Sequence, residues 1–288
     1  MKPTQLPQGL AYRVVTVDDS TIRAADIADL IVIHDNSLTS CTLTRPVIAQ
    51  GVTTIVHSTV MNDARISGTA RVNHSIISSS HVIDGGFIEA DAGCSCLNLH
   101  VEDGGYLGMM SGSYASGLYV ANDGVVVVSP GAVVSDLTTG GDEADVQVLS
   151  GGTVSVAEVG WCDRLDIANG AVGSEISVQS GGNVLIGEYY PEYGRKRSTD
   201  VNVSFLYISS GGYACVEGSG TVVKNVHVST GGSLVISPGA TVDTCQVKKG
   251  AHVHVCNKAT LKNLCGAGSA GIEADAGSWI IYKNKEKK

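Results

Sequence analysis

Residues 209–250 read SSGGYACVEGSGTVVKNVHVSTGGSLVISPGATVDTCQVKKG and contain the Gly-Gly pair at Gly211–Gly212 again, twenty residues later, at Gly231–Gly232. Turns of the same kind recur along the chain at 18 to 20 residues, as in the series Gly86, Gly105, Gly124 and the series Gly212, Gly232, Gly250. A fixed period of this length indicates a repeat architecture, in which each unit buries its apolar face only against its neighbours.

The runs between the turns are short and alternate apolar with polar residues, which is typical of strands. We therefore predict an all-β fold, a single-stranded parallel right-handed β-helix (solenoid) of roughly ten coils, each of about 19–20 residues. A left-handed helix of hexapeptides fits fewer of the coils. Val222, Val242 and Leu261 are expected to stack in one column, and the Gly-Gly corners are expected to turn through positive φ.

The ends of the stack need caps, because open sheet edges promote aggregation. We predict an N-terminal helical/β cap over residues 1–36, a β-solenoid over 37–278, and a C-terminal cap with a charged tail over 279–288. The stretch DDSTIRAADIADL, residues 18–30, has the pattern of a short amphipathic helix with Ser20 or Thr21 as N-cap. Trp279 and Tyr282 are expected to cover the last coil.

Composition narrows the function. The chain of 288 residues has a net charge of −9 and no long basic stripe, which argues against nucleic acid and anionic membranes as partners. No window approaches eighteen consecutive apolar residues, so no membrane insertion is expected, and the N-terminus lacks the apolar region of a secretory signal. No cofactor motif is found, and no Gly-Gly pair is followed by the Lys-Ser/Thr of a phosphate loop.

Eight cysteines are spread through the chain without the CxxC spacing of a zinc site, which favours buried reduced thiols over disulfides or metal ligands. His252 and His254 alternate in a strand and should share one face. Without a third ligand nearby in sequence, no metal site is predicted there.

The clearest break in the period is the insertion EYYPEYGRKRSTD after Gly187. It gathers three tyrosines with three cations, a combination typical of recognition surfaces. The candidate ligand-binding residues are Tyr189, Tyr190, Tyr193, Arg195, Lys196 and Arg197. The alternative is a solvated loop whose tyrosines fold back over the coil.

The units VLSGGTVSV, VQSGGNVLI, ISSGGYACV and VSTGGSLVI resemble the repeats of AIDA-type autotransporter adhesins, over roughly residues 80–268. The resemblance implies a passenger-domain β-helix on the cell surface or secreted, with a host-cell or glycan surface as its partner. It also implies a glycosyltransferase acting on turn hydroxyls, which here are Ser150, Ser180, Ser210 and Thr230.

The predicted function is accordingly that of a non-enzymatic, adhesin-like structural protein, with no catalytic residues assigned. A β-helical carbohydrate-active enzyme, a lyase or glycosidase, would need acidic or basic residues clustered along one groove over successive coils. A left-handed acyltransferase would need a catalytic His between subunits of a trimer. A phage tail-fibre-like receptor-binding protein stays open, and with it a phage-borne or cytoplasmic location.

Overall fold

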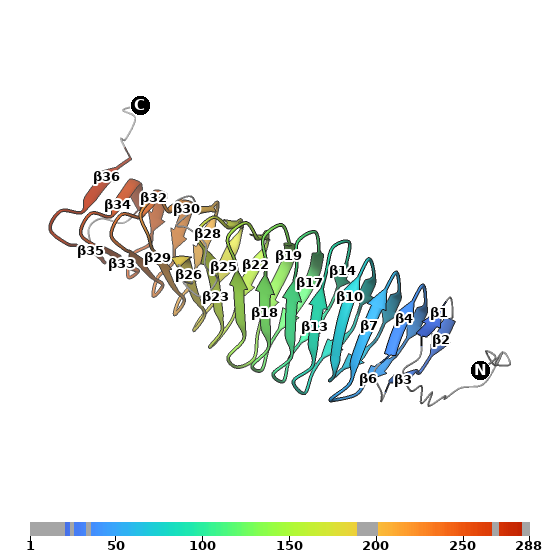
Figure 1. Ribbon diagram of the computed structural model, residues 1–288. Coiled ribbons are helices and arrows are strands. Elements are labelled where there is room, and N and C mark those ends of the chain that lie inside the picture. Colours follow the sequence, from blue (N-terminus) through green and yellow to red (C-terminus); the bar gives the residue numbers. More distant parts are fainter. Residues whose placement is uncertain (1–20, 24–25, 33–35, 189–200, 267–270, 284–288) are drawn as a thin grey trace, which may run out of the picture.

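The computed structural model describes residues 21–23, 26–32, 36–188, 201–266 and 271–283. These residues form a long rod in which the chain passes in order from one end to the other, each coil lying on the one before (Figure 1). All strand pairs between coils are parallel, as in the pairing of Ile88 with Leu107 and of Leu107 with Val126. The predicted all-β parallel solenoid is confirmed.

The strands form two long sheets that run the length of the rod. The first sheet has fourteen strands, one from each coil. They are β1 (Thr21–Arg23), β4 (Asn36–Thr39), β7 (Thr53–His57), β10 (Thr69–Asn73), β13 (Phe87–Ala90), β16 (Tyr106–Met109), β18 (Val125–Val128), β20 (Asp145–Val148), β23 (Arg164–Ala168), β26 (Asn183–Glu188), β29 (Tyr213–Val216), β31 (Ser233–Ile236), β33 (His252–Val255) and β35 (Ile272–Ala274).

In the second sheet the chain bends partway through each coil. Most coils therefore contribute either two short strands or one long strand that crosses the bend. Its strands are β2 (Asp26–Ala28), β3 (Ile31–Val32), β5 (Thr42–Thr44), β6 (Val47–Ile48), β8 (Val60–Asn62), β9 (Arg65–Ile66), β11 (Ile76–Ser78), β12 (His81–Val82), β14 (Ser95–Leu97), β15 (His100–Val101), β17 (Tyr114–Val120), β19 (Val133–Thr139), β21 (Thr153–Val154), β22 (Ala157–Val159), β24 (Val172–Gly173), β25 (Ile176–Val178), β27 (Asn202–Val203), β28 (Leu206–Ile208), β30 (Val222–Val228), β32 (Thr241–Val247), β34 (Thr260–Gly266) and β36 (Trp279–Tyr282).

The core is a continuous aliphatic column inside the rod. It forms because successive side chains of a strand point to opposite faces, so every second residue is buried. Val242 and Leu261 stack as predicted, but their partner in β30 is Val223, and Val222 pairs with Thr241 instead. A shift of one residue moves a side chain from one face of a strand to the other, which is why the prediction for Val222 was wrong.

In most coils the bend in the second sheet is made by one residue in the left-handed region. Asp63 has φ 56°, Asn98 has φ 50° and Asn225 has φ 53°. The same position of other coils holds Asp29, Arg45, Ser79, Gly117, Asp136, Glu175, Phe205, Thr244 and Asn263, all with positive φ. Asn and Asp are frequent there because their short polar side chains tolerate this conformation.

Coils near the N-terminus are shorter than the predicted 19–20 residues. Val56 pairs with Val72, sixteen residues later. Buried hydroxyl groups fill the inner corners of these coils: the backbone N–H of Thr59 donates to Ser75 Oγ over 3.0 Å, and that of Ala64 donates to Ser80 Oγ over 3.0 Å. The hydroxyl groups thus satisfy backbone N–H groups at these inner corners.

The two glycines of a Gly-Gly corner have different tasks. Gly104 has φ +73°, and a Cβ added to it would meet only the backbone N of Gly85, 4.0 Å away. Gly105 is not in the left-handed region, but a Cβ there would lie against the carbonyl oxygen of Val82 in the preceding coil, far inside contact distance. Positive φ therefore explains only the first glycine of the pair, and close approach between coils explains the second.

The helix predicted over residues 18–30 is wrong for the residues that the structure describes there, since Thr21–Arg23 and Asp26–Ala28 are strands. Ile22 pairs with Leu38 and Ile27 with Leu43, so pairing with the next coil outweighs a weak helical pattern. Among the described residues no helix is long and apolar enough to cross a bilayer.

The C-terminal aromatic residues do not cover the last described coil. The side chains of Trp279 and Tyr282 are exposed, at 67% and 60% of their surface. Both lie in β36, which pairs in parallel with β34, and Ile272 and Ile280 are the apolar residues that pack against the core at this end. The alternation of β36 thus turns Trp279 outward, where sequence reasoning placed it over the end.

Candidate functional site

Three of the predicted glycosylation residues lie on consecutive coils at one corner of the rod. Ser180, Ser210 and Thr230 occupy the turns that lead into β26, β29 and β31. The turns are stacked by backbone hydrogen bonds, in which the N–H of Gly181 donates to Gly211 O and that of Gly211 to Gly231 O, each over 2.9 Å. We call these three residues the turn hydroxyl column.

The side chains of the column lie at the surface, against the turn of the next coil. All three residues are exposed. A Cβ on Gly211 would lie 2.7 Å from Ser180 Oγ, and one on Gly231 would lie 2.7 Å from Ser210 Oγ. Thr230 Oγ1 donates to Lys249 O over 2.9 Å. Glycine at these positions therefore avoids a clash with the hydroxyl groups of Ser180 and Ser210.

Ser150 lies on a different corner. Its turn connects β20 to β21, and the turn is stacked on Gly131 and Gly170 through backbone hydrogen bonds of 2.8 Å that involve Gly151. Ser150 is only partly exposed. The sequence could not separate it from the column, because both corners of the coil use the same Ser-Gly-Gly turn.

Trp161 extends the column by one coil and was missed by the sequence analysis. It is 65% exposed, and its Cα and ring pack against Gly181. A Cβ added to that glycine would be 3.3 Å from Trp161 Cγ. The signal was available, because Trp161 precedes Ser180 by nineteen residues, the length of one coil. An exposed indole beside an acceptor hydroxyl group offers a flat apolar surface for a sugar ring.

The predicted recognition loop, Tyr189, Tyr190, Tyr193, Arg195, Lys196 and Arg197, lies outside the described residues. The strands that flank it are paired with their neighbours, with one register shift between Ile167 and Ala168 where β23 pairs with β26. Val184 of β26 pairs with Ala214 of β29, thirty residues later, and Val172 of β24 pairs with Asn202 of β27. The pairing of β26 with β29 and of β24 with β27 is therefore kept across the insertion.

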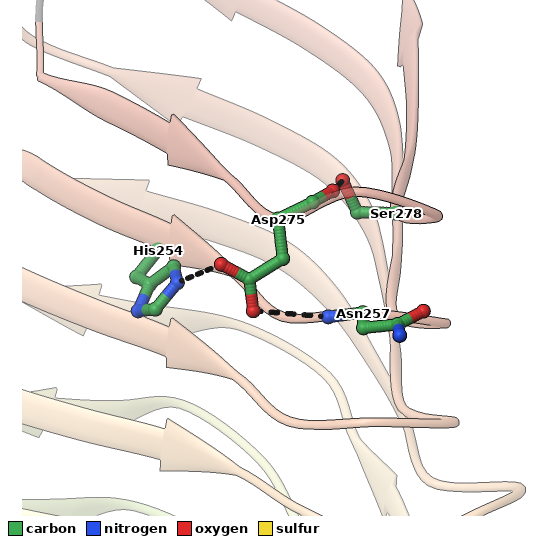
Figure 2. Close-up of polar contacts among 4 residues, drawn as sticks. All are labelled: His254, Asn257, Asp275 and Ser278. Carbon is green, nitrogen blue, oxygen red and sulfur yellow. Dashed lines mark hydrogen bonds and ion pairs between the residues drawn. The ribbon is translucent and has the colours of Figure 1, made fainter.

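His254 has partners that sequence reasoning did not find. As predicted, His252 and His254 face outward from β33, while Val253 and Val255 are buried. His254 Nε2 lies 3.0 Å from Oδ1 of Asp275, whose Oδ2 accepts the backbone N–H of Asn257 over 3.3 Å (Figure 2). The hydrogen bond from His254 holds the pKa of Asp275 below its usual value. Cys256 contributes a thiol to the same group of potential metal ligands.

A second group of potential ligands lies on the second sheet, where His81 and His100 pair in register. Their rings are 4.6 Å apart between centroids, and His81 Nδ1 lies 2.9 Å from Glu102 Oε1. This group contains imidazole and carboxylate donors and no thiol.

The cysteines are all free thiols, and five of the eight are buried as predicted, whereas Cys256 and Cys265 are partly exposed. Burial and the nearby Cys94 raise the pKa of Cys96 to about 12, and burial with the nearby Cys265 raises the pKa of Cys245 to about 12. Such thiols stay protonated at neutral pH and are poor nucleophiles. Cys162 is exposed, in the turn next to Trp161.

Comparison with solved structures finds a likeness to a TibA fragment, residues 55–350, that is described as hyper-glycosylated by TibC. The sequences are 18% identical, the TM-score is 0.49, and the match covers 92% of this chain and 98% of the TibA fragment. No protein-family model and no curated protein matches the chain.

Proposed function

We propose that this protein is a non-enzymatic, adhesin-like structural rod, displayed at a cell surface, whose turn hydroxyl column carries O-linked sugar. The observation that carries the proposal is the column itself. Ser180, Ser210 and Thr230 are exposed and lie on successive coils, and the hydroxyl groups of Ser180 and Ser210 each lie over a glycine of the next coil. A transferase that recognises one such turn meets the same backbone on the next coil.

Glycosylation is tested by intact-mass measurement of the protein purified from its native host. We expect additions in sugar-sized steps, and a loss of up to three steps in the triple variant Ser180→Ala, Ser210→Ala, Thr230→Ala. Ser150→Ala is measured separately, because Ser150 is the fourth predicted acceptor and lies on the other corner. A mass equal to that of the bare chain, or additions unchanged in the triple variant, contradicts the proposal for the column.

For binding, we propose that the insertion after Gly187 contacts the host-cell or glycan partner. Its three tyrosines and three cations fall in the sequence between β26 and β27, and the strand pairs β24–β27 and β26–β29 are both formed. Rigid amphipathic rings and guanidinium groups are the side chains that interfaces favour.

Removing residues 189–197 should reduce binding to cells or to a glycan array at least about tenfold, because such rings and cations carry much of the binding energy in interfaces. The strand pairing kept across the insertion predicts that the shortened chain keeps its fold, which circular dichroism checks. Equal binding by both chains would remove the role of the loop.

A further inference from the structure

The C-terminal coils bring three metal-ligating side chains of different chemistry to one place. His254 and Cys256 are two residues apart in and just after β33, so both point to the same face. The next coil places Asp275 beside Cys256, and its N–H donates to Val255 O over 3.0 Å. The ligand atoms of His254, Cys256 and Asp275 all lie within 4.8 Å of one another.

The carboxylate is held in place by the protein itself. One oxygen of Asp275 faces His254 Nε2 and the other accepts the N–H of Asn257, while Ser278 Oγ donates to the backbone oxygen of Asp275 over 2.8 Å (Figure 2). Contacts of this kind around a ligating carboxylate orient it before an ion binds, which reduces the cost of assembling the site.

We propose that His254, Cys256 and Asp275 form a three-ligand site for a divalent transition metal of the zinc class. Imidazole nitrogen, thiolate sulfur and carboxylate oxygen together suit Zn²⁺ and Co²⁺, whereas Ca²⁺ and Mg²⁺ prefer oxygen alone. With three protein ligands, a tetrahedral ion keeps one position for water or for an external ligand.

Binding exchanges one set of contacts for another. The thiol of Cys256 releases its proton to solvent and binds as thiolate, and the neutral imidazole of His254 binds through Nε2 with its proton on Nδ1. The hydrogen bond between His254 and Asp275 is replaced by one bond from each residue to the ion. Because two ligands come from one coil and the third from the next, the ion ties β33 to β35 and should protect the last coils from opening.

Titration with Co²⁺ tests the proposal, because only a thiolate ligand gives a sulfur-to-cobalt charge-transfer band in the near ultraviolet. The full chain, kept reduced, should develop this band with one equivalent of Co²⁺, and excess Zn²⁺ should bleach it. Cys256→Ser should abolish the band. Asp275→Asn should weaken binding about tenfold or more, as expected when a ligand or its orientation is lost.

Two variants serve as matched controls. His81→Ala disrupts the other histidine cluster, which has no thiol, and Cys162→Ser removes an exposed cysteine elsewhere on the rod. Both should keep the band. Absence of the band in the unmodified chain, its persistence in Cys256→Ser, or saturation only at millimolar Co²⁺ would each overturn the site. Far-ultraviolet circular dichroism checks that each variant is folded.

Discussion

Replacing Gly105 by alanine is expected to destabilise the solenoid by about 2 to 3 kcal/mol, the scale of an overpacked interior. The new Cβ would lie against the carbonyl oxygen of Val82 and 3.0 Å from that of Glu102. Neither oxygen can move freely, because Val82 O accepts the N–H of Glu102 over 3.0 Å and Glu102 O accepts the N–H of Gly105 over 2.9 Å. The coils would have to separate to admit one methyl group.

Gly104→Ala is the matched control, since it adds the same methyl group one residue earlier. Its cost is that of a residue with a side chain at positive φ, about 1 kcal/mol. The next coil already carries Asp123 with φ 61° at the corresponding position, followed by Gly124. Urea unfolding of the full-length variants measures the difference, and an equal loss of stability in both would show that the close approach of the coils is not what requires Gly105.

Truncating Leu107 to alanine is expected to cost about 2 to 5 kcal/mol, the range for large-to-small changes in a core. Leu107 is fully buried and stacks between Ile88 and Val126 in the first sheet. In a solenoid the neighbouring coils are fixed by their own pairing, so they cannot collapse far into the space that the leucine leaves.

Tyr106→Ala tests the opposite face of the same strand. Tyr106 stacks on Phe87 with ring centroids 4.8 Å apart and an interplanar angle of 2°, on the outer surface. Its loss should cost about 1 kcal/mol. Thermal or urea unfolding of both variants checks the order of the two effects, and a larger loss for Tyr106→Ala would contradict the assignment of the inner face.

The repeat alone was enough to predict the architecture, because the Gly-Gly corners mark the coil length between Gly86 and Gly250. It was less informative where a coil uses other means. Thr59 and Ser75 fill inner corners of the N-terminal coils with hydroxyl groups, and no Gly-Gly pair stands before Gly85 to mark the shorter period of sixteen residues. The bend residues share a backbone conformation and no residue type, as Asn98, Glu175 and Phe205 show, and a sequence pattern cannot find them.

The candidate sites also divide into features that the sequence could predict and features that it could not. Ser150 could not be separated from the turn hydroxyl column by sequence, because the two corners of the coil have the same turn. The partner of His254 could have been found, since Cys256 and Asp275 are nineteen residues apart and therefore one coil apart. Such an inference requires the correct strand register. The register predicted from the sequence was wrong by one residue at Val222.

Val184 pairs with Ala214 across the thirty-residue coil. The folding of the rod and the sequence of the insertion are therefore under separate constraints. The residues that specify folding lie in the coils on either side, and their pairing does not depend on the sequence of the inserted segment. The sequence of that segment can therefore vary, or a foreign peptide can replace it, while the rod keeps its fold. The rod is thus a scaffold whose folding does not depend on the sequence inserted after Gly187.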